Sequence, residues 1–66
     1  MRITVVRDKK EEEVDMNDGA TAMDVLAALD LLPDAHIVLR GSVPIPIDGV
    51  LEVGDRIRII RVASGG

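Results

Sequence analysis

The last three residues of the chain, Ser64, Gly65 and Gly66, are the part of the sequence whose chemistry is most readily specified. A terminal carboxylate has a pKa of about 3.5, so at neutral pH it is ionised and a poor electrophile. Neither glycine has a Cβ atom, so the segment can pass extended through a narrow channel. We therefore expect Gly66 to carry a carboxyl group that reacts after activation, and Gly65 to give it clearance. The alternative is a frayed end without function.

The other side chains that could do chemistry do not group into an enzyme site. His36 is the only histidine, without a second ligand at suitable spacing, so neither a metal site nor a general base is expected. We interpret the acidic stretch of Glu11, Glu12, Glu13 and Asp15 as a solvated strand or turn rather than a cation site. Cysteine is absent, which excludes disulfides, thiolate metal sites and a cysteine nucleophile. The sequence thus predicts a protein that is not an enzyme and holds no cofactor or metal.

Length and composition limit the number of domains, the kind of core and the classes of partner. The 66 residues are enough for one domain, and its core must be aliphatic because aromatic residues are absent. The net charge of −4 argues against nucleic acid as the main partner. No apolar run approaches the roughly 18 residues of a membrane span, and no signal peptide precedes the first strand. We expect a cytoplasmic protein that is a monomer when alone.

Only two lysines, Lys9 and Lys10, occur in the chain. Any chain formation through an internal amine would therefore use one of them or the amine of Met1. Their expected role is solubility.

The opening of the sequence predicts a β-hairpin. Residues 2–7 alternate between apolar and polar and are rich in β-branched side chains, and residues 11–16 follow as the returning strand after a polar turn. The expected inward side chains are those of Ile3, Val5, Val14 and Met16.

One helix follows the hairpin. Thr21 is a good N-cap residue, and Asp24 supplies an acid to the first turn. Pro33 is expected to end the element, with Leu31 and Leu32 packed under the sheet. Spacings of i, i+3, i+4 and i+7 give one apolar stripe of Ala22, Val25, Leu26 and Leu29.

The second half of the sequence predicts three more extended segments. Residues 35–40 and 56–62 are strands, whereas 43–47 contains two prolines and can only be a short edge strand or an extended segment. With strands this short, the helix must lie across one face of a mixed sheet, in an α+β fold. The domain then spans residues 1–62, and residues 63–66 form a flexible tail.

Three segments carry a resemblance to a known family: residues 19–29, residues 38–41, and residues 53–60 running on to 63–66. In these segments the chain resembles the ubiquitin-like sulfur carriers, which include the bacterial carriers ThiS and MoaD, the thiouridine carrier of thermophilic bacteria and the small archaeal modifier proteins. The specific motif is a Gly-Asp turn before the last strand, followed by terminal Gly-Gly. The family often has asparagine where Arg40 stands.

This resemblance implies a β-grasp fold, in which the first and last strands are parallel neighbours, and a function for the tail. An E1-like activating enzyme would use ATP to adenylate the carboxyl group of Gly66. A sulfur donor would then convert it to a thiocarboxylate for a sulfur-accepting enzyme of tRNA thiolation, thiamine synthesis or molybdopterin synthesis. Attack by an amine would instead give an isopeptide bond to target lysines, as in a protein modifier. The third alternative is a non-covalent β-grasp module that binds RNA or a regulator.

Strand alternation predicts a partner-binding patch on the sheet face opposite the helix. We take Ile37 and Leu39 to face the helix on one strand, and Ile57 and Ile59 on the last strand. The residues that would then face outward are Val38, Arg40, Arg58 and Ile60. Ubiquitin has an apolar patch with basic neighbours at the corresponding places. The alternative is that these are ordinary scattered aliphatic residues.

Overall fold

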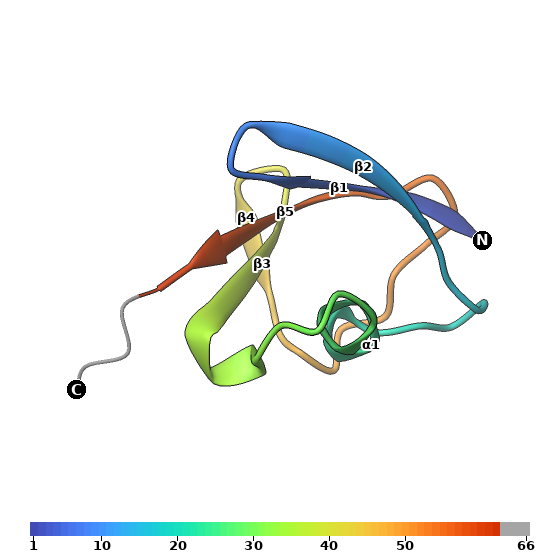
Figure 1. The fold of residues 1–66 in the computed structure, drawn as a ribbon. Helices are drawn as coiled ribbons and strands as arrows, with labels where there is room; N and C mark the ends of the chain where they lie inside the picture. Colours follow the sequence, from blue (N-terminus) through green and yellow to red (C-terminus); the bar gives the residue numbers. More distant parts are fainter. Residues whose placement is uncertain (63–66) are drawn as a thin grey trace.

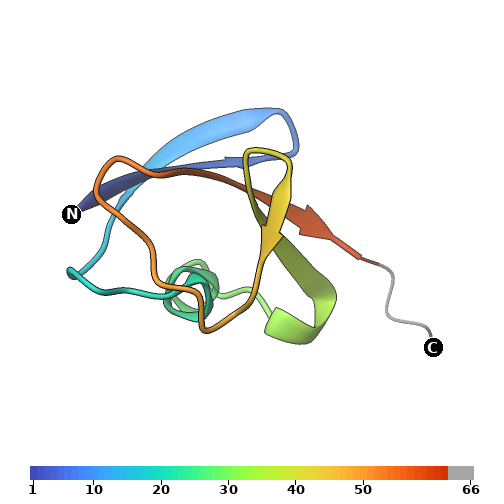
Figure 2. The same ribbon diagram turned by 180° about the vertical axis from the view of Figure 1, so that it is seen from behind.

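Five strands and one α-helix make up the protein in a computed structural model that describes residues 1–62 (Figure 1). The elements in chain order are β1 (Arg2–Arg7), β2 (Lys10–Asp15), α1 (Ala22–Ala28), the 3-10 turn η1 (Pro33–Ala35), β3 (His36–Arg40), β4 (Val43–Ile45) and β5 (Arg56–Arg61). All five strands belong to one sheet with the order β2-β1-β5-β3-β4. Views from the front and from behind both show α1 on one side of this sheet (Figure 1 and Figure 2).

The strand pairing is that of a β-grasp. β1 and β5 lie parallel at the middle of the sheet, with Val5 opposite Ile57, whereas the other three pairs are antiparallel. The predicted parallel pairing of the first and last strands is therefore confirmed. β4 is an edge strand, one of the two alternatives expected for residues 43–47, and Pro44 is tolerated there because it cannot donate a ladder hydrogen bond.

An aliphatic core lies between α1 and the sheet. Burying one such side chain contributes about 1.5–3 kcal/mol relative to leaving it exposed. The predicted inward phase of β1 and β5 is confirmed, and Val14 and Met16 pack at the margin of the core. The buried cluster consists of Ile3, Val5, Ala22, Val25, Leu26, Val38, Leu51, Ile57 and Ile59.

The helix begins as expected but ends earlier. Thr21 accepts a hydrogen bond from the amide of Asp24, whose carboxylate accepts one from the amide of Thr21, which completes a capping box. α1 ends at Ala28, followed by Asp30 in a left-handed conformation with φ of +61°. The amide of Leu31 then donates back to the carbonyl of Leu26, as in a Schellman motif. The prediction that Pro33 ends the helix was wrong, because this cap has already closed it.

The segment after the helix separates two leucines that were expected to behave alike. Leu31 packs against the core, but Leu32 is 71% exposed, so the prediction for Leu32 was wrong. Leu32 has an extended backbone, with φ of −79° and ψ of 128°, ahead of the turn η1, and in an extended segment consecutive side chains point to opposite sides.

Candidate docking face and the strand that leads to the tail

β5 is the strand that leads to the predicted reactive tail, and it occupies the centre of the sheet. β1 pairs with it on one side and β3 on the other. The amide of Val62, the residue after the strand, donates to the carbonyl of Ala35 at 2.8 Å. The chain is therefore held in place up to Val62. The predicted tail, with Ser64, Gly65 and Gly66, lies outside the described residues.

The Gly-Asp pair before β5 sets the start of the strand. Gly54 adopts a φ of +80°, a region that L-residues with a side chain rarely adopt. Its amide donates to the carbonyl of Arg2, and the carbonyl of Asp55 accepts from the amide of Thr4. These backbone bonds fix the register of β5 against β1.

The side chain of Asp55 tightens the same turn. It is only 14% exposed and accepts hydrogen bonds from the amide of Glu52 at 2.8 Å and from Arg40 Nη2 at 2.7 Å. Partial burial acts to raise the pKa of Asp55, but the bonds from Glu52 and Arg40 outweigh it and hold the pKa below its usual value. Arg40 also donates to the carbonyl of Val50 at 3.2 Å. We call these contacts the Asp55 clamp.

The face of the sheet opposite α1, here called the open face, carries an apolar strip across its central strands. Ile37 pairs with Ile60, and the two side chains are about equally exposed, at 40% and 41%. Leu39 pairs with Arg58, which in turn lies beside Val6 across the parallel pairing. The open face thus combines aliphatic side chains with a central arginine.

Two members of the predicted patch do not lie on this face. Val38 pairs with Ile59 and is only 2% exposed, so it belongs to the core. Arg40 pairs with the buried Ile57 and therefore projects on the helix side, where it forms the Asp55 clamp. The predicted phase of β3 was wrong by one residue, whereas the outward placement of Arg58 and Ile60 is confirmed.

Sequence reasoning missed Val6, Ile37 and Leu39 as members of the open face. In β3, three consecutive aliphatic side chains give no alternation from which the phase could be assigned. The polar residues at the ends of the strand, His36 and Arg40, carried the only signal. His36 pairs with Arg61 and Arg40 pairs with Ile57, and both of these β5 residues are on the helix side of the sheet. The polar residues at the ends of β3 therefore did not mark the face that is exposed to solvent.

Most charged side chains of the open face are paired with one another. On the β2 side, Arg56 bonds to Glu11, and Arg2 bonds to Glu13 and Asp15. The hydrogen bond and charge of Arg56 hold the pKa of Glu11 below its usual value. The acidic stretch therefore makes ion pairs within the protein.

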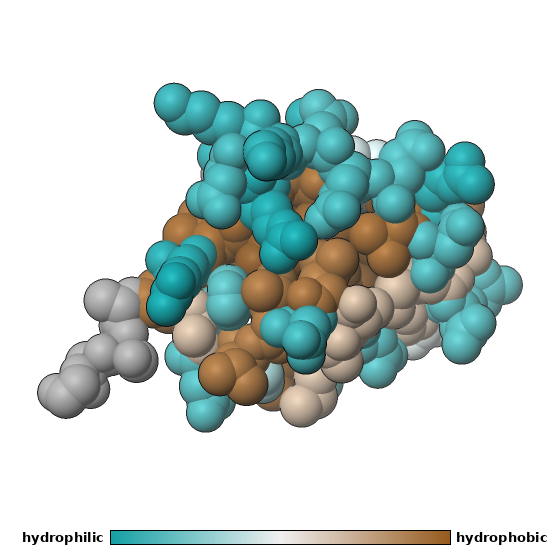
Figure 3. Space-filling view, in the orientation of Figure 1, coloured by the Kyte–Doolittle hydropathy of each residue, from teal (hydrophilic) through white to brown (hydrophobic). Residues whose placement is uncertain are grey.

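Among the described residues, four cations lack such partners, and of these only Arg58 lies on the open face. Lys9 is in the β1–β2 turn, and Lys10 and Arg61 follow the phase of the buried residues of their strands. Arg2, Arg7, Arg40 and Arg56 each form an ion pair with a carboxylate. Within residues 1–62, no ion pair involves Lys9, Lys10, Arg58 or Arg61. Seen from the side, with the sheet and α1 both in view, the protein has hydrophobic surface reaching the outside among hydrophilic side chains (Figure 3).

The structure places His36 at the start of β3, where it has a local partner. Its Nδ1 donates to the carbonyl of Leu32 at 2.8 Å, which ties the strand to the preceding turn. In the described part of the chain, no three His, Cys, Asp or Glu side chains are grouped so that they could hold a metal ion. Nor does any helix of residues 1–62 have the length and hydrophobicity required to cross a membrane.

Comparison with solved structures identifies the same fold elsewhere. The crystal structure of SAMP1 from Haloferax volcanii matches with a TM-score of 0.77 and 21% identity, covering 100% of both chains. A ubiquitin from Caldiarchaeum subterraneum matches with a TM-score of 0.72 and 20% identity, covering 100% of this chain and 98% of the other. These similarities establish the ubiquitin-like β-grasp fold.

Sequence comparison identifies the family. Small archaeal modifier protein 2 of Haloferax volcanii is 37% identical over 67 residues, covering the full length of both proteins. A protein of Archaeoglobus fulgidus is 37% identical over 59 residues, covering 89% of this chain and 85% of the relative. The family model of small archaeal modifier protein 2 matches residues 1–63. The chain therefore belongs to this family, whose ubiquitin-like members act in sulfur transfer or protein conjugation with E1-like activating enzymes and are not enzymes themselves.

Proposed function

We propose that this protein is a cytoplasmic sulfur carrier that works through the carboxyl group of Gly66. The observation that carries the proposal is the position of Gly65 and Gly66, within five residues of Arg61, where the central strand β5 ends. A strand held in a sheet and followed within a few residues by two glycines can deliver a carboxylate into the active site of another protein. The protein itself binds no cofactor, and ATP is consumed by the activating enzyme.

The proposed chemistry has two steps, adenylation of the carboxylate and replacement of AMP by sulfur. The Gly66 carboxylate attacks the α-phosphate of ATP, which forms an acyl-adenylate and releases pyrophosphate. Hydrosulfide then attacks the acyl carbon, so that a C–S bond forms, the C–O bond to AMP breaks and AMP leaves. The resulting thioacid loses its proton to water and becomes a thiocarboxylate, and no oxidant or reductant is needed. A sulfur-accepting enzyme of tRNA thiolation, thiamine synthesis or molybdopterin synthesis would receive the sulfur.

The second candidate function is conjugation to target proteins. The names of the matched family and of its Haloferax volcanii relative contain the word modifier, which favours this candidate. In this case a lysine amine, rather than hydrosulfide, attacks the acyl carbon of the Gly66 adenylate, so that an isopeptide bond forms, the C–O bond to AMP breaks, AMP leaves and the amine loses a proton to water.

The open face supplies the docking surface in either case. We assign partner binding to Ile60 and Arg58, as the sequence predicted, and replace Val38 and Arg40 with Ile37, Leu39 and Val6. Support comes from the pairing of Ile37 with Ile60 and of Leu39 with Arg58, which makes one continuous strip on the sheet.

The absence of cysteine makes the two functions separable by alkylation. A thiocarboxylate is a good sulfur nucleophile, so it reacts rapidly with iodoacetamide at neutral pH, while methionine reacts far more slowly. The protein is incubated with the activating enzyme of its host, ATP and sulfide and is then treated with iodoacetamide. Its intact mass is measured by mass spectrometry. The carrier function predicts one alkylated product located at Gly66. Lysine-linked conjugates without any thiocarboxylate would replace it with the modifier function.

A further inference from the structure

A hollow lies where the β1–β2 turn meets the end of β5. Lys9 from the turn and Arg58 and Arg61 from β5 line it, together with the aliphatic side chains of Val6 and Ile60. These three cations are among the four that form no ion pair within residues 1–62. A protein with a net charge of −4 therefore gathers three of its uncompensated positive charges at one site beside the apolar strip.

The other charged residues at this hollow do not neutralise it. Asp8 is the one carboxylate in the lining, and it makes no ion pair among the described residues. Arg7 also borders the hollow but is paired with Glu12 at 3.3 Å. The hollow keeps a net positive charge with either residue included.

The backbone at Lys9 gives an independent indication of function. Asp8 and Lys9 have φ values of +48° and +64°, which place both central residues of the turn in the left-handed region. Glycine and asparagine are favoured at such positions, whereas a lysine costs about 1 kcal/mol or more. In the described chain the Lys9 side chain forms no ion pair or hydrogen bond that would offset this strain. Strained positions of this kind are common where a side chain serves binding.

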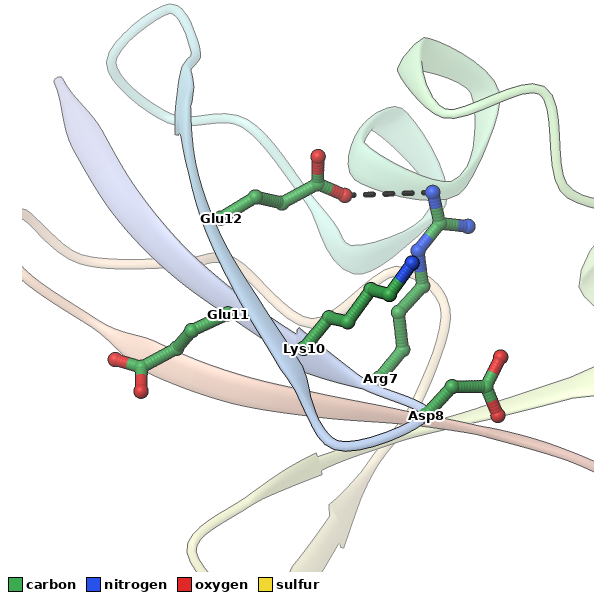
Figure 4. A pocket seen from close by; sticks show the side chains of 5 residues that line it. All are labelled: Arg7, Asp8, Lys10, Glu11 and Glu12. Atoms are coloured by element: carbon green, nitrogen blue, oxygen red, sulfur yellow. Dashed lines mark ion pairs between the residues drawn. The ribbon is translucent and has the colours of Figure 1, made fainter.

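Lys10 shows what an ordinary lysine of this turn does. It pairs with Arg7 across the hairpin and lines a different hollow, together with Glu11 and Glu12. In the close-up, Lys10 and Glu12 extend on the same side as Arg7, whereas Glu11 points away from them (Figure 4). The hollow that Lys10 lines has three carboxylates, those of Asp8, Glu11 and Glu12, beside Arg7, whereas the hollow that Lys9 lines has only that of Asp8.

We propose that this hollow binds the carboxylates of an acidic segment on the activating enzyme, whose apolar side chains rest on Val6 and Ile60. This inference rests on the proposed function and adds the chemistry of the partner. An acidic protein segment fits better than nucleic acid, because the site has no aromatic side chain on which bases could stack and only three uncompensated cations. Opposite charge at the rim of an interface speeds encounter and selects the partner.

The test compares variants that each remove one positive charge. Lys9→Gln, Arg58→Gln and Arg61→Gln are matched with Lys10→Gln and Arg56→Gln, whose cations lie among the acidic residues of β2. Direct binding to the activating enzyme and ATP–pyrophosphate exchange are both measured at low and high salt. We expect each hollow variant to weaken binding about tenfold and each control less than about threefold, with exchange at saturation unchanged. The triple hollow variant should also lose most of the salt dependence of the wild type.

Each other outcome overturns a defined part of the account. Equal losses in the hollow variants and the controls would show only a general charge effect and overturn the acidic-segment proposal. Binding of a single-stranded oligonucleotide that depends on Lys9 and Arg58, with enzyme binding unaffected by them, would assign the site to nucleic acid. Binding that depends on the cations but gives no pyrophosphate exchange would leave the site standing and overturn the proposed function. A wild type that does not bind the enzyme would overturn both.

Discussion

The turn before β5 is held by side-chain and backbone hydrogen bonds, whereas the end of β5 is held by backbone bonds alone, and in residues 1–62 the side chains of Arg58 and Arg61 form none. The Asp55 clamp and the backbone bonds of Gly54 hold the start. Arg58, Ile60 and Arg61 follow toward the end, two of them cations without an ion pair within residues 1–62. The comparison indicates that the Gly-Asp motif stabilises the turn before β5, and that the residues that recognise the partner lie at the end of the strand, next to the tail.

The largest predicted effect separates the two faces of β3. Val38→Asp places a charge in the core and should destabilise the protein by more than about 3 kcal/mol, enough to unfold a domain of this size. The neighbouring Ile37→Asp should change stability by less than about 1 kcal/mol because its side chain reaches solvent. Urea unfolding of both variants measures the difference. Comparable stabilities would show that the phase of β3 is other than described.

The next effect concerns docking at the end of β5. Ile60→Asp should weaken binding to the activating enzyme about tenfold, because it places a carboxylate in the apolar strip and beside the hollow. Its unfolding free energy should remain within about 1 kcal/mol of wild type, as for Ile37→Asp. Titration of the enzyme with each variant gives the affinities. Normal binding by a folded Ile60→Asp variant would remove the open face from the docking assignment.

The third prediction tests whether the Asp55 clamp stabilises the turn before β5. Asp55→Asn weakens its charge-assisted bond to Arg40 and should cost about 1–2 kcal/mol at neutral pH. Because the folded pKa of Asp55 lies below its unfolded value, its contribution is present above the unfolded pKa of about 3.9 and is lost as pH falls through the folded pKa. The stability difference between wild type and variant should therefore shrink below about pH 4. Denaturant unfolding from pH 7 to pH 2 measures it, and a difference that grew in acid would contradict the assignment.

The smallest effect concerns the strained turn. Lys9→Gly relieves a positive φ but adds entropy to the unfolded chain, so stability should rise by at most about 1 kcal/mol. The same variant should bind the activating enzyme about as weakly as Lys9→Gln. A variant that gained stability without losing affinity would show that the strain at Lys9 serves no binding role.

Sequence reasoning reached the fold because local patterns and global topology agreed. Alternation in β1 and β5 and the capping box at Thr21 each indicated one structure, Pro44 and Pro46 left an edge strand or an extended segment, and the β-grasp topology came from the family resemblance. The helix end was missed because an aspartate, Asp30, occupies the left-handed position where glycine is the usual signal.

The candidate site was predicted only in part, for reasons that are physical. Arg58 and Ile60 alternate with buried isoleucines, so their phase was readable. The phase of the three consecutive aliphatic residues in β3 could not be assigned, because any of their side chains could fill the core. Lys9 was assigned to solubility, since neither its left-handed backbone nor its arginine neighbours can be deduced from one-dimensional spacing.

The most direct test of the account is ATP–pyrophosphate exchange by the activating enzyme with the full chain and with a chain lacking Gly65 and Gly66, each also unfolded in urea. The truncated chain should support no exchange, yet its unfolding free energy should stay within about 0.5 kcal/mol of the full chain. Retained exchange, or a loss of several kcal/mol, would contradict the claim that the carboxyl group of Gly66 is the working part of the protein.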